Sequence, residues 1–152
     1  MLLSKLLSAD RVRVPLGSRT KSEVLRELVE LVATGRDGAS VDAILSSVHE
    51  REQVLSTGIG DGIAIPHGRT PYVDDLVLAA GVASDGIDFD ALDGKPVRLF
   101  FLLIGPEAAS GEHVKALSRI SRLMRRDQLR VELMRAPSAD EFLRLINASE
   151  AA

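Results

Sequence analysis

The sequence predicts an α/β fold in which a β-sheet lies between layers of helices. Short apolar runs rich in Val, Ile and Phe alternate along the chain with segments of helical period. The expected order is a strand, two helices, three strands and three helices, which is typical of a layered α/β domain. With 152 residues the chain is long enough to bury a real core, and we expect one domain over residues 1–150.

The N-terminal part is expected to form a strand and then a helix. Polar and apolar residues alternate over 11–16, which indicates a strand with one face toward the core. Thr20 then caps a helix, and Glu23 completes a capping box with it. Gly35 is expected to stop this helix. Its buried stripe is formed by Val24, Leu28, Leu31 and Val32.

A second helix is expected to start after Ser40 and to end near Arg51. Its inward positions are Val41, Ile44, Leu45 and Val48. Three apolar runs bounded by Gly, Pro and Asp follow, and they indicate buried strands covered on both faces. They are GIAI (62–65), LVLAAGVA (76–83) and VRLFFLLI (97–104).

The remainder of the chain has a helical period. A helix is expected from Ser110, and two shorter helices should cover 127–136 and 138–147. The core-facing positions of the first of these three helices are predicted to be Val114, Leu117, Ile120 and Met124.

Composition excludes several classes of function. The formal net charge of −3 argues against a general nucleic-acid binder, which needs a basic surface. The chain has no cysteine, so disulfides and thiolate chemistry are excluded on it. The N-terminal MLLSKLLSADR is too short and too charged for a signal peptide, and no apolar run reaches membrane-spanning length. We therefore expect a cytoplasmic protein that does not insert into a membrane.

Three histidines could carry chemistry, and each has a structural interpretation as well. His49 lies at a helical position beside two charged residues, so a surface role is favoured. His113 lies in the first turn of a predicted helix and could simply begin it. His67 follows the strand-like GIAIP and precedes Gly68, a setting that suggests a presented imidazole, although a structural turn would explain the glycines equally well.

Other chemistries find no matching pattern. The histidines lack the spacing of a metal site such as H-E-x-x-H, so no metal and no cofactor is expected. The nucleophile motif G-x-S-x-G, the P-loop and G-x-G-x-x-G are absent. Histidine as a phosphoryl-accepting nucleophile remains. Transfer of a phosphoryl group needs cationic and N–H donors, which Arg51, the hydroxyls of Ser56 and Thr57, and glycine amides could supply.

The sequence resembles the type-2 enzyme IIA domains of the bacterial phosphoenolpyruvate-dependent phosphotransferase system, the fructose, mannitol and nitrogen-regulatory class. The resemblance runs from about Leu7 to Ile146, and its specific core is REQVLSTGIGDGIAIPHG, which matches the family signature at Glu52, at Ile59 and Gly60, and through IAIPHG. Within this core His67 falls on the phosphorylated histidine and Arg51 on the active-site arginine. His113, in GEHVKALSRISRLM, falls on the second active-site histidine.

The resemblance implies a fold and a mechanism. The family fold is a mixed sheet sandwiched by helices, a three-layer α/β/α arrangement. The donor would be a histidine-containing phosphocarrier protein, and the phosphoryl group would go onto Nε2 of His67. A backbone carbonyl at Nδ1–H would fix that tautomer. His113, whose protonation the N-terminus of its helix disfavours, would stay neutral and donate a hydrogen bond to the phosphoryl oxygens.

The acceptor is less determined by the sequence. In this class the IIB domain carries phosphate on cysteine, which this chain lacks, so any IIB acceptor would be a separate protein. The chain looks most like the nitrogen-regulatory branch, whose members act by binding regulatory target proteins according to phosphorylation state. One alternative is a separate fructose-type IIA that feeds a sugar transporter. Another is a non-catalytic anion-binding regulatory module on the same fold.

Overall fold

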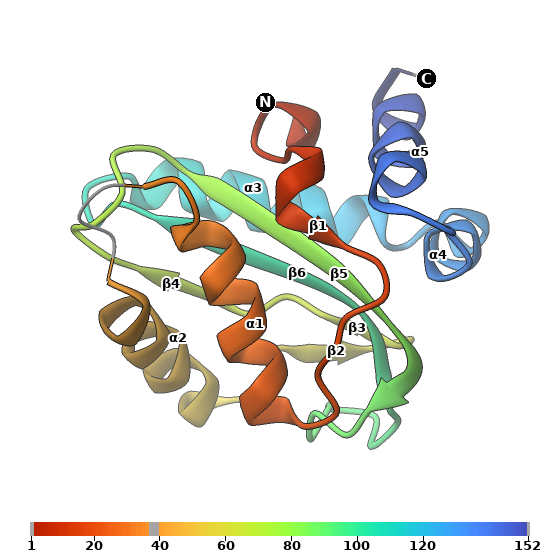
Figure 1. Cartoon of the computed structure of the whole chain (residues 1–152), viewed down its shortest axis with the longest axis horizontal. Coiled ribbons are helices and arrows are strands. Elements are labelled where there is room, and N and C mark those ends of the chain that lie inside the picture. The colour runs from red at the N-terminus through yellow and green to blue at the C-terminus, as the bar shows by residue number, and fades with distance from the viewer. Residues whose placement is uncertain (1, 37–39, 152) are drawn as a thin grey trace.

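A mixed β-sheet lies between two layers of helices in the computed structural model, which describes residues 2–36 and 40–151 (Figure 1). The strands are β1 (Val12–Arg13), β2 (Gly58–Gly60), β3 (Ile63–Ala64), β4 (His67–Arg69), β5 (Val77–Ile87) and β6 (Val97–Gly105). The helices are α1 (Lys21–Ala33), α2 (Val41–Val54), α3 (Ser110–Leu123), α4 (Asp127–Met134) and α5 (Ala139–Ala151), with short 3-10 turns at Leu3–Lys5 and Ala9–Arg11. The predicted α/β/α architecture is confirmed.

Strands β5 and β6 form the antiparallel centre of the sheet. Strand β1 adds to β5 in parallel, and β3 and β4 both add in parallel to the other side of β6, one after the other along its length. Strand β2 pairs with β3 in antiparallel fashion and forms the far edge. The apolar runs predicted to be buried strands are those of β3, β5 and β6.

Two strands were not predicted, and the strands expected over 11–16 and 62–65 are both shorter than expected. Strands β2 (GIG) and β4 (HGR) have three residues each, too few and too poor in β-branched residues to show a strand pattern. The strand expected over 11–16 is paired only at Val12 and Arg13. Pro15 cannot donate to a strand ladder, which limits this edge strand.

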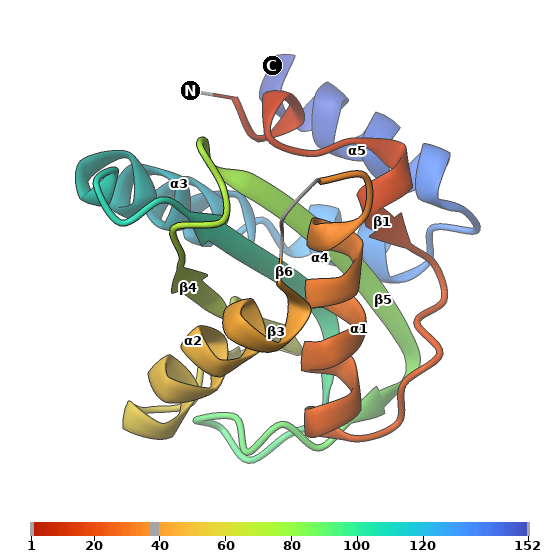
Figure 2. The same cartoon turned by 60° about the vertical axis from the view of Figure 1, so that its left-hand side comes forward.

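The helices cover the two faces of the sheet as separate layers. Figure 2 shows α1 and α2 on one side of β5 and β6, and α3, α4 and α5 on the other. The predicted capping box at the start of α1 is confirmed, because Thr20 accepts the Glu23 N–H while the Glu23 carboxylate accepts the Thr20 N–H. Gly35, at φ +75°, follows the end of α1, and α2 runs three residues past the expected end at Arg51.

Helix α3 is rotated relative to the expected orientation. Its buried face is formed by His113, Ala116, Ile120 and Leu123. Val114, which was expected to face the core, is 60% exposed, and Leu117 is only partly buried. The alternative face has the same helical spacing, but a rule that counts histidine as polar does not select it. The consequence is that α3 directs an imidazole inward.

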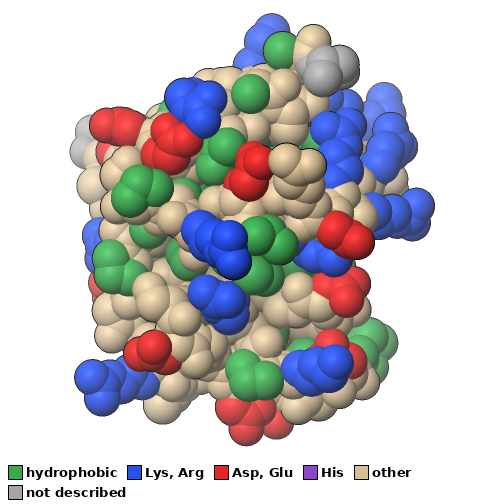
Figure 3. All heavy atoms as spheres, turned by 90° about the vertical axis from the view of Figure 1, so that its right-hand side faces the viewer, with side chains coloured by type: hydrophobic (Ala, Val, Ile, Leu, Met, Phe, Trp, Pro, Cys, Tyr) green, Lys and Arg blue, Asp and Glu red, His purple; other side chains and the backbone are tan. Residues whose placement is uncertain are grey.

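Charged side chains of both signs share the right-hand face of the molecule in Figure 1. Figure 3 shows this face with basic, acidic and hydrophobic side chains interspersed and no histidine visible. Within residues 2–36 and 40–151, no helix is long and apolar enough to cross a membrane.

Candidate functional site

The sequence-predicted residues His67, His113 and Arg51 lie together where α2, β4 and α3 meet. They line one cavity of about 490 Å³. The other lining residues are Ser47, Glu50, Gly68, Arg69, Val114 and Leu117. The ring centroids of His67 and His113 are 5.6 Å apart, and the rings are inclined at 61° to each other. Two histidines far apart in sequence thus form one imidazole pair.

The break between β3 and β4 positions His67. Ile65 and Pro66 interrupt the edge of the sheet, and β4 resumes pairing with β6 at His67, opposite Leu103. The Ile65 carbonyl lies 2.9 Å from Nδ1 of His67. A carbonyl only accepts hydrogen bonds, so Nδ1 carries the proton and Nε2 holds the free lone pair. This is the carbonyl contact that the sequence analysis expected.

The pKa of His67 is lowered from its ordinary value. Burial is the main cause, and the positive charges of Arg51 and Arg69 lower the pKa further, while the hydrogen bond to the Ile65 carbonyl and the charge of Glu52 oppose the shift. A lowered pKa keeps the imidazole neutral at physiological pH. A neutral imidazole is the form that can act as a nucleophile.

His113 is more deeply buried than His67, with 3% of its surface exposed. Burial, reinforced by the neighbouring His67 and Arg69, lowers the pKa of His113 to about 4. The sequence analysis expected a neutral His113 but attributed it to the helix terminus. Its Nδ1 is buried and has no hydrogen-bond partner among the described residues.

Gly105, the last residue of β6, makes room for this histidine. A Cβ atom at Gly105 would lie 2.5 Å from Leu76 Cδ2 and 3.1 Å from His113 Nδ1. Contacts below about 3 Å require a neighbour to move. The absence of a side chain at Gly105 therefore permits the inward orientation of α3 at its first turn.

The cavity also carries two arginines that no carboxylate neutralises through an ion pair among the described residues. Arg51 is held in place by a hydrogen bond of 2.8 Å from its Nη1 to the Leu55 carbonyl. Arg69 lies two residues after His67 on β4, so both side chains are on the same side of the strand. Their positive charges suit a phosphoryl group beside the imidazoles.

Close packing of α2 against β4 fixes the cavity wall. The Ser47 hydroxyl donates to the Arg69 carbonyl at 2.7 Å and accepts the Arg69 N–H at 3.2 Å. A Cβ at Gly68 would lie 3.0 Å from the Ser47 hydroxyl and 3.2 Å from the Val48 backbone nitrogen. The absence of a side chain at Gly68 thus allows α2 to approach β4 closely.

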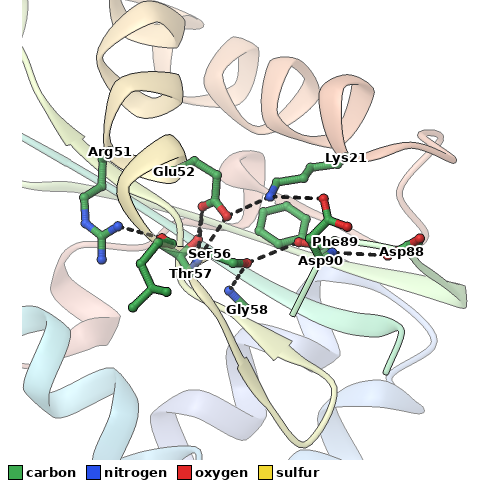
Figure 4. A network of polar contacts seen from close by, with 10 residues as sticks. Lys21, Arg51, Glu52, Ser56, Thr57, Gly58, Asp88, Phe89 and Asp90 are labelled. Carbon is green, nitrogen blue, oxygen red and sulfur yellow. Dashed lines mark hydrogen bonds and ion pairs between the residues drawn. The ribbon is translucent and has the colours of Figure 1, made fainter. Parts of the chain in front are cut away.

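Ser56 and Thr57, which were expected to stabilise a phosphoryl group, do not line this cavity. The Ser56 hydroxyl donates to the Phe89 carbonyl, and the Thr57 hydroxyl donates to the Glu52 carboxylate (Figure 4). Thr57 is 4% exposed. As placed here, both hydroxyls hold the segment between α2 and β2 rather than face the imidazoles.

Four polar or glycine residues at the site were not predicted from the sequence, namely Ser47, Glu50, Arg69 and Gly105. A signal for three of them was available. Ser47 lies three residues before Glu50 and four residues before Arg51 on α2, so helical spacing makes it a neighbour of both, and Arg69 follows His67 at strand spacing. Nothing local distinguishes Gly105, because its neighbours His113 and Leu76 are distant in sequence.

The arrangement fits anion chemistry better than metal chemistry. Among the residues that the structure describes, no three His, Cys, Asp or Glu side chains are grouped to hold a metal ion. Two neutral imidazoles and two guanidinium groups can instead accept and stabilise a phosphoryl group.

Comparison with known proteins points to the same chemistry. Residues 5–149 match the family model described as "Phosphoenolpyruvate-dependent sugar phosphotransferase system, EIIA 2". A nitrogen regulatory protein of Pseudomonas aeruginosa is 35% identical over 144 residues, which cover 95% of this chain and 94% of that protein. The fructose-specific EIIABC component of Bacillus subtilis is also 35% identical, over 97% of this chain but only 23% of its own length.

Solved structures give a matching result. The crystal structure of nitrogen regulatory protein IIA-Ntr from Neisseria meningitidis superposes with a TM-score of 0.88 at 31% sequence identity. The match covers 95% of this chain and 98% of that one. The family-model match over residues 5–149 includes every residue that lines the cavity.

Proposed function

Because the chain belongs to the type-2 EIIA family of the phosphoenolpyruvate-dependent sugar phosphotransferase system, we propose that it accepts a phosphoryl group on Nε2 of His67. The donor is a histidine-containing phosphocarrier protein. The observation that carries the proposal is the Ile65 carbonyl at Nδ1 of His67. This contact leaves Nε2 as the nucleophilic nitrogen in a cavity that also contains Arg51 and His113.

The transfer step needs no cofactor. The Nε2 lone pair of His67 attacks phosphorus on the donor's phosphohistidine and forms a new N–P bond. The N–P bond of the donor breaks, and its electron pair returns to the donor's imidazole. The proton on Nδ1 of His67 stays in its hydrogen bond to Ile65. Arg51 and the Nε2–H of His113 stabilise the charge that is spread over the phosphoryl oxygens.

We assign the chain to the nitrogen-regulatory branch of the family, where the phosphorylation state of His67 would control binding to regulatory target proteins. Two observations support this branch. The P. aeruginosa nitrogen regulatory protein matches over nearly the whole of both chains, and the IIA-Ntr structure superposes with a TM-score of 0.88. The fructose-specific relative instead matches over 23% of a much longer protein.

A sugar-transport role is the second candidate, and the 35% identity to the fructose-specific relative favours it. In that role the chain would pass the phosphoryl group to a separate IIB protein. The third candidate, a non-catalytic anion-binding module, is disfavoured, because such a module needs no imidazole with a fixed tautomer facing a second imidazole.

Phosphorylation of the purified protein tests the proposal directly. Incubation with phosphoenolpyruvate, enzyme I and a phosphocarrier protein should add one acid-labile, base-stable phosphoryl group, which intact-mass spectrometry detects. His67→Ala should remove the label. His49→Ala is the matched control, since His49 does not line the cavity, and it should retain the label.

Two results would contradict the assignment. A label that survives in the His67→Ala variant would place the phosphoryl group elsewhere. No label on the wild-type protein, with an active phosphocarrier protein shown to label another IIA protein, would favour the non-catalytic module. Transfer from the labelled protein to a purified IIB protein would favour the sugar-transport role over the regulatory one.

A further inference from the structure

A buried carboxylate lies next to the cavity and takes no part in the proposed transfer step. Glu52 follows Arg51 in the last turns of α2, and its side chain is only 5% exposed. Its two oxygens accept the backbone N–H of Thr57 at 3.2 and 3.0 Å, and one of them also accepts the Thr57 hydroxyl (Figure 4). The Nζ of Lys21, from the start of α1, lies 2.9 Å from the other oxygen.

Both oxygens of the buried Glu52 carboxylate have hydrogen-bond or ion-pair partners. A buried carboxylate is costly unless hydrogen bonds and an opposite charge satisfy it, and Glu52 has both. Lys21 is itself held, because its Nζ lies 4.6 Å from the centre of the Phe89 ring and 3.9 Å from an Asp90 carboxylate oxygen. Figure 4 shows Lys21 directed at Glu52, Glu52 directed at Thr57, and Ser56 beside the Phe89 segment.

The contacts continue from Thr57 to the nucleophile. The Thr57 carbonyl accepts the Ile65 N–H at 3.0 Å, and the Ile65 carbonyl in turn accepts Nδ1–H of His67 at 2.9 Å. On the other side, Arg51 donates to the carbonyl of Leu55, two residues before Thr57. Both His67 and Arg51 are therefore tied to the segment 55–57, which Glu52 holds.

We propose that Glu52, supported by Lys21, is a positioning residue for phosphoryl transfer. It fixes segment 55–57 and, through Thr57 and Ile65, the orientation and tautomer of His67. Glu52 lines no part of the cavity, so it acts through its neighbours. The inference rests on the proposed function for its effect on rate, but its effect on the His67 tautomer can be measured independently.

The competing interpretation is an ion pair that only stabilises the fold, and the chain offers a closely matched control for it. Glu27 on α1 accepts the backbone N–H groups of Gly17 and Ser18 and the Ser18 hydroxyl, and it pairs with Arg13 at 3.3 Å. Its side chain is 12% exposed. Glu27 thus holds a loop against a helix through the same kinds of partner as Glu52, namely backbone N–H groups, a hydroxyl and a basic side chain. None of its hydrogen bonds or ion pairs among the described residues is with segment 55–57.

The experiment compares Glu52→Gln with Glu27→Gln by three measurements. Thermal unfolding reports stability, single-turnover transfer from the phosphorylated phosphocarrier protein reports rate, and ¹⁵N NMR of the imidazole nitrogens reports the His67 tautomer without phosphate. We expect both variants to lose stability. Only Glu52→Gln should mix the Nε2–H tautomer into His67 and slow transfer by about tenfold to a hundredfold, the effect of a misplacement of about 1 Å.

Wild-type tautomer and wild-type rate in Glu52→Gln would overturn the proposal, and so would an equal loss of rate in Glu27→Gln. If Glu52→Gln does not fold, Thr57→Val decides by the same measurements, because it removes the hydroxyl while keeping the backbone N–H. It should shift the tautomer and rate in the same direction by less, and no shift would again overturn the proposal. A wild-type protein that accepts no phosphoryl group would refute the proposed function, while the tautomer comparison would still test positioning.

Discussion

Two histidines with different partners share the cavity, and their surroundings assign them different tasks. His67 has its Nδ1 proton bound to a carbonyl, so only Nε2 is available for bond formation. His113 has a pKa lowered to about 4 by burial, so it is a neutral imidazole in the unphosphorylated protein. A neutral donor stabilises the incoming charge without surrendering a proton to it.

The pH dependence of stability should reveal the buried His113. Its folded pKa of about 4 lies below the unfolded value of about 6.5, so the unfolded chain binds more protons between these values. The stability that His113 contributes is present above pH 6.5 and is lost as the pH falls toward 4. We expect His113→Gln to flatten the fall in melting temperature between pH 7 and pH 5.

Melting temperatures at pH 7.5 and above give the pH-independent effect of the substitution, against which the slopes are compared. Parallel curves for the wild-type protein and His113→Gln down to pH 5 would mean that His113 takes up its proton equally well in the folded protein.

Arg51 should affect the rate more than the fold. Arg51 is partly exposed, and its guanidinium group donates a hydrogen bond to the Leu55 carbonyl. Arg51→Lys keeps the charge but loses the planar set of donors. Phosphorylation should slow by about tenfold to a thousandfold, the scale of losing one preorganised donor, with little change in melting temperature. A large drop in melting temperature with a normal single-turnover rate would make Arg51 a structural residue.

A site residue could be predicted from the sequence where the residues that determine its role are close to it in the chain. Pro66 and the glycines around His67 are adjacent in the chain and made this histidine a candidate, and the family signature that contains it selected it over a structural turn. The roles of Ser56 and Thr57 could not be predicted, because their hydroxyl partners are the Phe89 carbonyl and a carboxylate on α2. A hydroxyl beside a motif has many acceptors within reach, and only the fold selects one.

At the scale of elements, the first turn of α3 packs closely against Gly105, where a Cβ would lie 3.1 Å from His113 Nδ1. The helix buries the face that contains this ring and leaves Val114 exposed. The side chain of Val114 is left at the mouth of the cavity. The orientation of α3 therefore decides which of its side chains line the cavity.

Gly105→Ala tests this relation. The added methyl group would overlap Leu76 Cδ2 and crowd His113 Nδ1, so stability should fall by about 1–3 kcal/mol, as for other overpacked cores. Transfer should also slow, because His113 must move. Thermal unfolding and single-turnover transfer measure the two effects.

Gly111→Ala is the matched control, since Gly111 lies two residues from His113 in the same helix and a Cβ there meets nothing within 4 Å. It should leave the transfer rate unchanged and should not lower the melting temperature. A Gly105→Ala variant as stable and as active as Gly111→Ala would show that the space at Gly105 has no influence on α3.

The elements themselves were predictable where a long apolar period or a cap was present. The capping box of Thr20 and Glu23 marked the start of α1 at the correct residue, and the long apolar runs identified β5 and β6. Strands β2 and β4 contain glycine in place of a periodic apolar pattern. Their pairing is decided by the neighbouring strands β3 and β6, which no local pattern records.

At the scale of the whole molecule, the central strands are buried on both faces. One core lies under α1 and α2, and the other lies under α3, α4 and α5. The sequence predicted this layering because continuous apolar strands need cover on both sides. It did not reveal that β3 and β4 follow each other along the same side of β6, an arrangement that sets the Ile65 carbonyl against the His67 ring.

The pairing of β4 with β6 also bears on when, during synthesis of the chain, the site for the phosphoryl group can form. His67 leaves the ribosome before Val97–Gly105 and before His113, so a nascent chain carries the nucleophile without the strand that supports it or the imidazole that faces it. Given the proposed function, the nucleophile, its supporting strand and the second imidazole can come together only after residues 97–113 have been synthesised.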